Sequence, residues 1–260
     1  MEVVILPDAH AVAVLAADAF EALVRAKPAA VLGLATGSSP LPVYEELARR
    51  HRSQGLSFAR VRGFGLDEYV GLVPGHPQSY AQVLQHEFAG RLDIDPANVR
   101  VPDGTAADLP AACRDYEEAI RACGGVDLQL LGVGTDGHIG FNEPGSSLLS
   151  RTRVKTLTEQ TRRDNARFFD GPDEVPRHVV TQGLGTILEA RHAVLLATGA
   201  RKAEAVKALV EGPLAAFCPG SVLQLHPHAS VLLDEPAAAG LALADYYRQT
   251  YADKPAWQRL

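Results

Sequence analysis

A short strand that runs into a glycine-rich loop, at residues 126–145, constrains the fold of this chain more than any other feature. Residues 128–133 are mainly apolar, which is typical of a strand buried on both faces of a sheet. The glycines of the loop allow its backbone to approach a ligand closely. The loop also carries three side chains that can move or stabilise protons: Asp136, His138 and Glu143. Because open α/β sheets place their active sites at the carboxyl ends of strands, we expect the catalytic centre here.

Two other interpretations of this loop compete with a catalytic one. Residues 132–137 match the G-x-G-x-x-G pattern of dinucleotide-binding proteins, but that pattern requires a helix directly after the glycines. Gly140 and Pro144 follow instead, and no amphipathic run begins until well past Ser150, so the sequence disfavours a nucleotide site. In the second interpretation the loop is only structural, and its Asp and His satisfy backbone groups, as Asp readily does in turns. The loop by itself leaves this alternative open.

Strand and helix patterns alternate along almost the whole chain. The predicted strands are residues 3–6, 30–35, 61–66, 128–133, 153–157, 193–197 and 230–233. The predicted helices are residues 11–26, a segment through 44–47, 79–90, 108–124, 159–169, 202–210 and 237–251. This alternation indicates an α/β fold with an open, mainly parallel sheet and helices on both faces. Since no repeat, low-complexity tract or linker is apparent, we expect residues 1–260 to form a single domain.

Composition and charge argue against several classes of protein. The formal net charge of −6, with no basic block, argues against nucleic acid as a partner. No apolar run approaches the roughly 20 residues of a membrane span, and the N-terminus lacks the basic region of a signal peptide. The three cysteines are odd in number and lack C-x-x-C spacing, which fits a reduced, cytoplasmic compartment without disulfides or a zinc site.

The segment from Gly33 to Pro42 joins a predicted strand to a predicted helix through a turn of small residues that suits an anion. Thr36, Ser38 and Ser39 offer hydroxyl groups. Gly37 allows backbone N–H groups to converge, and the helix N-terminus adds a dipole that favours phosphate. The segment is not a Walker A loop, because no Gly-Lys-Ser/Thr follows. An ordinary helix N-cap at Ser39 explains the segment, taken alone, about as well.

A second strand-to-helix junction, at residues 196–202, has the same layout and places Lys202 in the first turn of a helix. A lysine there opposes the helix dipole, so an anionic ligand would explain it, although a solvated surface lysine is the simpler interpretation of one position. Arg167 lies on the charged segment 161–169, for which a solvent-facing side chain is the simpler interpretation. Together, the three features favour a phosphorylated small molecule over a nucleotide.

A second pair of acids, Asp67 and Glu68, directly follows a predicted buried strand. Adjacent residues of an extended segment point in opposite directions, so one carboxylate can face the cleft and the other a neighbouring element. A carboxylate in a partly dry pocket has a raised pKa and can act as general base for a C–H proton, the hard step of aldose–ketose isomerisation. The alternative is a capping Asp at the end of a strand.

Taken together, these segments resemble the glucosamine-6-phosphate deaminases, also called glucosamine-6-phosphate isomerases, over nearly the whole chain. The resemblance rests on residues 34–40, 66–72, 79–80, 132–144, 150–157, 165–169 and 223–227. Loop glycines followed by Asp-Gly-His occur also in the related 6-phosphogluconolactonases. Asp67-Glu-Tyr-Val70 and Phe141-Asn-Glu-Pro144 are similar to the deaminase branch.

The resemblance implies a Rossmann-like fold and the conversion of glucosamine 6-phosphate and water to fructose 6-phosphate and ammonia, a hydrolysis at a C–N bond in amino sugar catabolism. It implies neither a metal nor an organic cofactor. By resemblance, His138 opens the pyranose ring, and Asp136 and Glu143 orient it and set its charge, which agrees with the effect of a carboxylate on an imidazole. Asp67 matches the base that removes the C2 proton. The expected substrate-binding residues are Thr36, Gly37, Ser38, Ser39, Arg167 and Lys202.

The resemblance also implies features outside the catalytic centre. Residues 158–188 match the mobile lid of the family, with charges and glycines that suit closure over a substrate. Some family members are hexamers activated by N-acetylglucosamine 6-phosphate between subunits, so a homo-oligomer and this activator are expected partners beside the sugar phosphate. The residues that match the effector site are Ser146, Ser147, Arg153, Lys155 and Tyr246.

Two other functions stay open on the sequence. A 6-phosphogluconolactonase is a hydrolase that would need only His138 and the phosphate-binding residues. A non-catalytic sugar-phosphate sensor, such as the effector domain of a transcription regulator, belongs to a different class. We expect no separate DNA-binding domain, because the first predicted strand begins near Val3.

Overall fold

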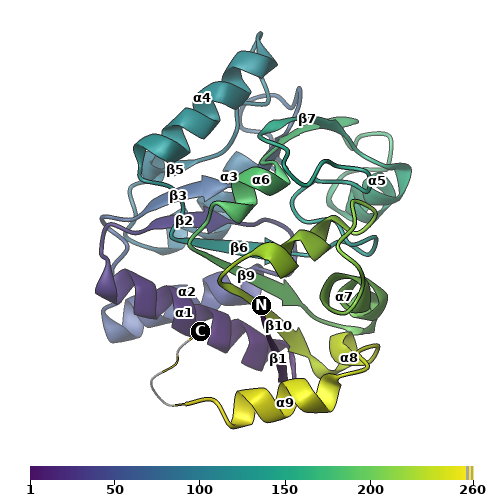
Figure 1. Ribbon diagram of the computed structural model, residues 1–260. Coiled ribbons are helices and arrows are strands. Elements are labelled where there is room, and N and C mark those ends of the chain that lie inside the picture. The colour runs from purple at the N-terminus through teal and green to yellow at the C-terminus, as the bar shows by residue number, and fades with distance from the viewer. Residues whose placement is uncertain (256–257, 259) are drawn as a thin grey trace.

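A seven-stranded sheet forms the centre of the fold in the computed structural model, which describes residues 1–255, 258 and 260 (Figure 1). Every neighbouring pair of its strands is parallel. In spatial order the strands are β1 (Glu2–Leu6), β10 (Ala229–Asp234), β9 (His192–Ala197), β6 (Leu128–Gly132), β2 (Val31–Leu34), β3 (Arg62–Gly65) and β5 (Val99–Arg100). The predicted open, mainly parallel sheet is therefore confirmed.

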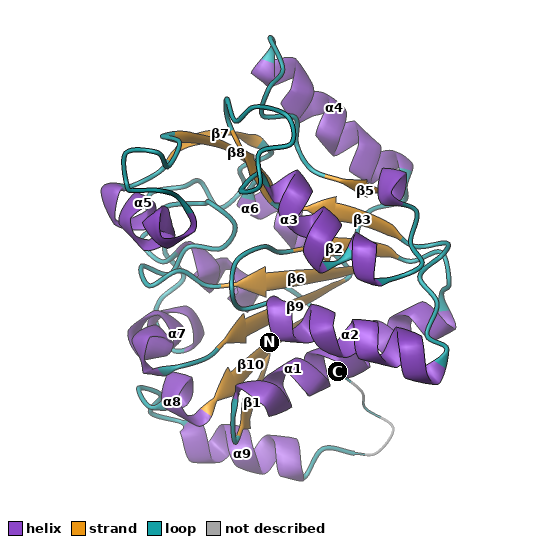
Figure 2. Ribbon diagram, turned by 180° about the vertical axis from the view of Figure 1, so that it is seen from behind, coloured by secondary structure: helices purple, strands orange, loops and turns teal. Residues whose placement is uncertain are grey.

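Helices cover both faces of this sheet, as predicted. Helices α1 (Ala9–Ala26), α2 (Leu41–Gln54) and α3 (Tyr80–Glu87) lie on the face that Figure 2 turns toward the viewer. Helices α6 (Leu184–Leu188) and α7 (Ala203–Val210) lie on the other face, seen in Figure 1. The remaining helices are α4 (Leu109–Ala122), α5 (Glu159–Asn165), α8 (Glu235–Ala238) and α9 (Ala244–Ala252). No helix in the described part of the chain has both the length and the hydropathy to span a membrane.

Local sequence signals set the helices that flank the site. The Asp8 side chain caps α1, and the Ser79 side chain caps α3 at the predicted position. Helix α1 buries a stripe of apolar residues at four-residue spacing, which turns one face toward the sheet. This stripe contains Val12, Ala16, Phe20 and Val24.

A second, smaller sheet lies beside the carboxyl end of the first. It contains β4 (Asp67–Tyr69), β8 (His178–Thr181) and β7 (Arg153–Thr156), paired antiparallel in the order β4-β8-β7. The sequence did not predict β4 or β8; the strand predicted at residues 61–66 is β3. The strand β3 ends at Gly65, and Asp67 begins β4, where it pairs with Thr181. Such a short strand is fixed by its distant partner rather than by its own pattern.

Other element boundaries also differ from the prediction. The predicted helix at 237–251 is two helices, α8 and α9, and Gly240, a poor helix former, lies between them. The predicted helix at 159–169 ends as α5 at Asn165 and continues as a 3-10 turn at Ala166–Phe168. The short elements β5 and α6 were not predicted.

Candidate active site

A cavity of about 490 Å³ opens at the carboxyl ends of β2, β6 and β9, between these strands, β4 and α5. Every predicted substrate-binding residue lines it: Thr36, Gly37, Ser38, Ser39, Arg167 and Lys202. Of the predicted catalytic residues, Asp67 and His138 also line the cavity. The structure thus brings together strand ends that are far apart in the sequence.

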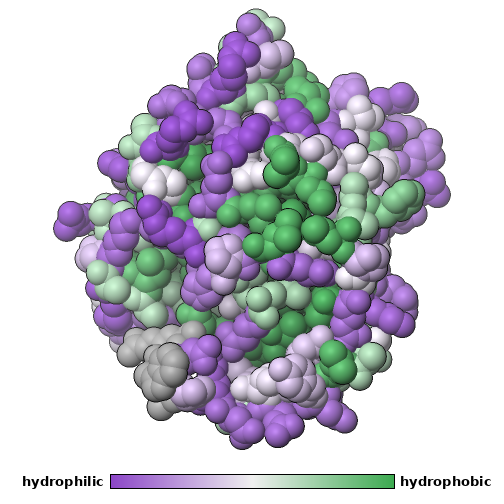
Figure 3. All heavy atoms as spheres, viewed as in Figure 1, coloured by the Kyte–Doolittle hydropathy of each residue, from purple (hydrophilic) through white to green (hydrophobic). Residues whose placement is uncertain are grey.

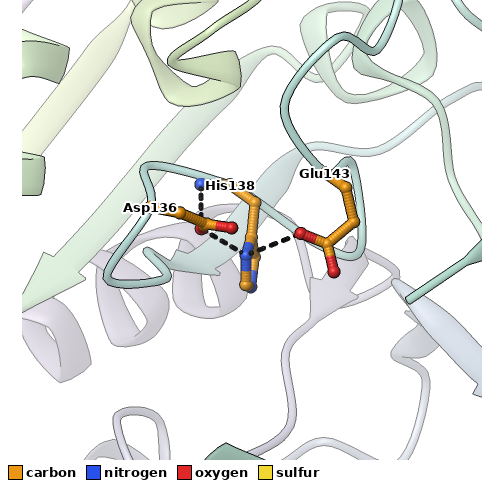
Figure 4. A group of neighbouring side chains, drawn as sticks. All are labelled: Asp136, His138 and Glu143. Carbon is orange, nitrogen blue, oxygen red and sulfur yellow. Dashed lines mark hydrogen bonds and ion pairs between the residues drawn. The ribbon is translucent and has the colours of Figure 1, made fainter. Parts of the chain in front are cut away.

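His138 lies between the two other predicted catalytic acids (Figure 4). Its Nδ1 is 2.7 Å from Oδ1 of Asp136 and 3.6 Å from Oε2 of Glu143. Asp136 Oδ1 also accepts the backbone N–H of His138 at 3.2 Å. Glu143 is buried, and its Oε1 accepts the backbone N–H of Thr158 at 3.1 Å. Both acids therefore stand behind the imidazole rather than among the residues that line the cavity.

The electrostatics of this cluster favour an ionised Asp136. Burial acts to raise the pKa of Asp136, but the hydrogen bond and the charge of His138 outweigh burial and hold that pKa below its ordinary value. An ionised Asp136 beside Nδ1 fixes the orientation of the imidazole. The loop can therefore present Nε2 of His138 at the edge of the cavity.

The same three side chains also have the composition of a metal site. One ligand atom from each of Asp136, His138 and Glu143 lies within 4.8 Å of the other two. The 2.7 Å between Nδ1 of His138 and Oδ1 of Asp136 is, however, a hydrogen-bond distance. Two ligands of one tetrahedral ion, with bonds of about 2.0–2.1 Å, would be about 3.3 Å apart. The geometry therefore fits an ion-paired acid–base cluster better than a metal site.

Two glycines of the loop make this arrangement sterically feasible. A Cβ on Gly134 would lie 2.3 Å from Cε1 of His138, so only glycine lets the imidazole pack there. Gly140 has a φ of 54°, in the left-handed region that glycine adopts without strain. A Cβ on Gly140 would also lie 3.1 Å from Oγ1 of Thr181 and 3.6 Å from Oδ2 of Asp67. These positions let the His138 loop approach the Asp67 strand.

The pKa of Asp67 is shifted in the opposite direction from that of Asp136. Its side chain is buried, and both burial and the nearby charge of Glu68 raise its pKa well above the ordinary value. Glu68 points the other way, as the alternation of the strand requires. Its carboxylate accepts the backbone N–H groups of Tyr69, Tyr80 and Ala81 at 2.8–3.0 Å, the last two at the start of α3. One carboxylate of the pair thus faces the cavity, and the other anchors a helix.

The predicted phosphate-binding turn leaves its hydroxyl groups free of a capping role. The alternative that Ser39 is the N-cap of α2 was wrong: the N-cap is Pro40, and no side chain caps this helix. A Cβ on Gly132 would lie 3.7 Å from Oγ of Ser39, which places the turn next to the carboxyl end of β6. The turn and the catalytic loop are therefore neighbours.

The two predicted cations differ in their surroundings. The Lys202 side chain is half-buried, and its Nζ donates to the carbonyl of Val133 at 2.7 Å. Burial lowers the pKa of Lys202, so the alternative of a solvated surface lysine was wrong. Arg167 is exposed, and its guanidinium lies 4.7 Å from the centroid of the Phe168 ring. Lys202 is held by the main sheet, whereas Arg167 depends on the position of α5.

Several residues that line the cavity were not predicted as site residues, among them Tyr80, Asn165 and Arg201. Tyr80 and Asn165 lie in segments that carry the family resemblance, but no chemical pattern marked them. Arg201 directly precedes Lys202 at the second strand-to-helix junction, and that position was the available signal.

The predicted effector residues do not all lie together. Ser146 is buried, and its Oγ donates to the carbonyl of Glu143 at 2.6 Å. Arg153 donates to Oδ1 of Asn142 at 2.7 Å, and Ser147 and Lys155 lie in the same stretch of chain. Tyr246 is exposed on α9, at the opposite end of the molecule from β7 in Figures 1 and 2. A single chain therefore does not bring all five residues into one effector site.

The predicted lid, at about 158–188, has two structurally different halves. Residues 158–177 form α5, the 3-10 turn and an irregular loop, in which Arg162 donates to the carbonyls of Pro172 and Val175. Residues 178–188 form β8 and α6, whose side chains Val179 and Leu184 are fully buried. Only the first half has the few buried contacts that suit a moving segment.

The fold and the cavity define a class of α/β proteins that combine an acid–base cluster and cations at the carboxyl ends of parallel strands. Residues 8–232 match the model of the family described as glucosamine-6-phosphate isomerases/6-phosphogluconolactonase, and the chain belongs to this family.

Among its relatives, a protein named glucosamine-6-phosphate deaminase from Arthrobacter sp. (strain FB24) is 70% identical over the full length of both chains. A protein of the same name from Mycolicibacterium smegmatis is 63% identical over 99% of each chain. A solved structure, described as a monomeric glucosamine-6-phosphate deaminase, is 43% identical with a TM-score of 0.91 and covers 93% of this chain and 100% of its own. A 6-phosphogluconolactonase from Trypanosoma cruzi, at 20% identity and a TM-score of 0.73, shares the fold over 93% of this chain and 97% of its own.

Proposed function

We propose that this chain converts glucosamine 6-phosphate and water to fructose 6-phosphate and ammonia. The observation that carries the proposal is the shared cavity of Asp67 and His138, a buried carboxylate of raised pKa opposite an imidazole backed by two acids. Relatives named for this activity, at 63–70% identity over nearly the whole chain, support it.

In the first step, His138 opens the sugar ring. Its Nδ1 faces Asp136 and Glu143, so Nε2 is the atom that can exchange a proton with the substrate. A proton delivered to the ring oxygen, with loss of the proton from the C1 hydroxyl, breaks the bond between the ring oxygen and C1 and releases the open-chain aldose with its C2 amine. The two acids fix the orientation of the imidazole.

In the second step, Asp67 removes the proton from C2. Its raised pKa makes the carboxylate a stronger base than an exposed Asp. Loss of the C2 proton and protonation of the C1 oxygen give an enolamine. Proton return to C1 then leaves an imine at C2, which water hydrolyses to the ketose and ammonia. The reaction is redox-neutral and consumes one water.

The phosphate group would bind between the turn at Thr36–Ser39, Lys202 and Arg167. The hydroxyls of the turn and the N-terminus of α2 supply hydrogen-bond donors and a favourable dipole. Lys202 supplies a positive charge in a half-buried position. We propose that residues 1–260 act as one domain, in which residues 158–177 close over the bound sugar and bring Arg167 to the phosphate.

We also propose that the chain forms a homo-oligomer that binds N-acetylglucosamine 6-phosphate as an activator. Figure 3 shows apolar side chains gathered at the centre of the face that carries α6. The segments 145–149 and 214–217 are joined by the Gly145 N–H to Ala216 carbonyl bond, and they expose Leu149 (81%) and Phe217 (86%). A second copy would cover such side chains and could bring its α9 to Arg153 and Lys155. Light scattering after size exclusion, with and without the activator, tests this proposal.

One assay separates the proposed activity from its alternatives. Purified protein is given glucosamine 6-phosphate, and both ammonia and fructose 6-phosphate are measured. Equal amounts of the two products are expected. The matched control is Asp67→Asn on 6-phosphogluconolactone, whose hydrolysis needs no base at C2. Lactone hydrolysis that survives in this variant, without ammonia from the amino sugar in the wild type, would favour the lactonase. A protein that only binds the sugar phosphate would be a sensor.

A further inference from the structure

Tyr69 is a buried aromatic residue with a polar contact network at its hydroxyl end. It lies in β4 two residues after Asp67, so both side chains point to the same face of the strand. Its ring packs against those of Tyr80, Phe141 and Phe169, with centroids 4.9–6.0 Å apart. Tyr69 is 2% exposed, and it is not among the residues that line the active-site cavity.

The hydroxyl of Tyr69 joins two residues that do line the cavity. Nδ2 of Asn165, at the end of α5, donates to the Tyr69 Oη at 3.0 Å. The Tyr80 hydroxyl, at the start of α3, donates to the same oxygen at 3.2 Å. The Tyr69 hydroxyl therefore links the start of α3 to the end of α5.

At its start, helix α5 is held by its N-cap Thr158, which donates to Glu143, and its Arg162 donates to carbonyls of the same lid segment, 158–177. The helix has seven residues, and Thr161 is the one that it buries. Asn165 is its last residue, and Arg167 follows two residues later in the 3-10 turn. The position of Arg167 therefore depends on how the end of α5 is fixed. A directional hydrogen bond can fix that end more tightly than the loose packing of a short helix.

We propose that Tyr69 is a positioning residue whose hydroxyl sets α5, and with it Arg167, relative to the base Asp67. This inference rests on the proposed function of the cavity. Tyr69 does not touch the substrate in this scheme. It sits on the strand that carries the base and holds the helix that precedes the phosphate-binding cation.

The experiment compares Tyr69→Phe with a matched control, Tyr116→Phe. The Tyr69 variant keeps the ring packing and removes only the hydroxyl. Tyr116 is also buried, but its hydroxyl donates to the Gly65 carbonyl of the main sheet at 2.6 Å and contacts no part of α5. Steady-state kinetics with glucosamine 6-phosphate and inhibition by inorganic phosphate are measured in both. Hydrogen exchange of residues 159–168 is followed by mass spectrometry.

Tyr69→Phe should raise KM and the phosphate inhibition constant about 3–10-fold, the range expected for one lost hydrogen bond, with kcat within about twofold. Exchange in residues 159–168 should speed up. Asn165→Ala should have the same effect, and the double variant should add little, because both remove one bond. Tyr116→Phe should change neither constant, even if it lowers the melting temperature.

Unchanged KM and exchange in Tyr69→Phe would overturn the inference, as would an equal KM rise in the Tyr116 control. A wild-type protein that releases no ammonia would refute the proposed function instead. The exchange of residues 159–168 and the binding of inorganic phosphate would then still decide the role of Tyr69, because neither needs turnover.

Discussion

The His138 loop and the Asp67 strand face the same cavity, yet they treat charge in opposite ways. The loop places two carboxylates within 3.6 Å of the His138 Nδ1, and His138 holds the pKa of Asp136 below its ordinary value, so the loop stabilises a negative carboxylate. The strand buries Asp67 beside a second acid, Glu68, so it destabilises the negative carboxylate. An imidazole that passes a proton needs an ionised carboxylate to orient it, and a base for a weak carbon acid needs a high pKa. The contrast therefore assigns the two chemical steps to two regions.

The most severe test of this contrast is Asp67→Asn. The amide keeps the shape of the side chain but cannot accept a proton, and positioned general bases typically contribute about 10²–10⁴-fold. We expect kcat to fall by that factor with little change in KM, as measured by ammonia release. Burial raises the pKa of Asp67. As the pH is lowered, the wild-type rate should therefore begin to fall at a pH well above the ordinary Asp value of about 3.9, because the base becomes protonated there. A variant with near-wild-type kcat would remove Asp67 from the mechanism.

His138→Gln should separate the two regions by step, with a loss of about 10²-fold or more on the cyclic sugar. The C2 chemistry does not need His138, so the variant should still exchange the C2 proton of the small open-chain fraction. Deuterium washout from C2-labelled glucosamine 6-phosphate, followed by NMR, measures this exchange. Asp67→Asn should fail to exchange whichever form is supplied. Washout that survives in the Asp67 variant but not in the His138 variant would reverse the two roles.

The two regions also differ in how well the sequence predicted them. Asp136, His138 and Glu143 lie within eight residues of one loop, so the local pattern was enough to place them together. The large sheet was predicted for a similar reason, because its strands carry their own apolar runs. The strand β4 has three residues and is defined by its pairing with β8, and no local sequence pattern predicted this pairing. For the same reason the contacts of Tyr69 with α5 could not be foreseen: they depend on how the small sheet folds against the lid.

The two cations of the cavity, Lys202 and Arg167, can be compared in the same way for their part in phosphate binding. Lys202→Ala should raise KM for glucosamine 6-phosphate about 10–100-fold, because a half-buried charge-assisted contact is lost. Arg167→Ala should raise KM less, about 3–10-fold, because its charge is exposed and more strongly screened. Added salt should reduce the Arg167 effect more than the Lys202 effect. Neither change should matter for unphosphorylated glucosamine; equal losses on both substrates would indicate a folding role.

The smallest expected effect, and the most direct test of the electrostatic contrast, is on stability. The folded-state pKa of Asp67 is raised, so its ionisation costs folding free energy as the pH rises above the unfolded value of about 3.9. The folded-state pKa of Asp136 is lowered, so its charge stabilises the fold above that same pH and ceases to do so as the pH falls. At pH 7, Asp67→Asn should therefore raise the melting temperature and Asp136→Asn should lower it. Each shift should be about 2–4 °C for every 1 kcal/mol involved.

The pH dependence distinguishes this cause from packing changes at the two sites. The Asp67 difference from the wild type should shrink as the pH is lowered toward about 4, because Asp67 is then protonated in the folded chain and largely protonated in the unfolded chain. The Asp136 difference should persist down to about pH 4 and shrink only below it, as the pH falls toward the lowered pKa of the folded state. Calorimetry from about pH 3 to 8 measures the two curves. A change of packing or hydrogen bonding would shift each melting temperature by a similar amount at every pH. Two shifts of the same sign at pH 7 would mean that the strand and the loop do not treat charge in opposite ways.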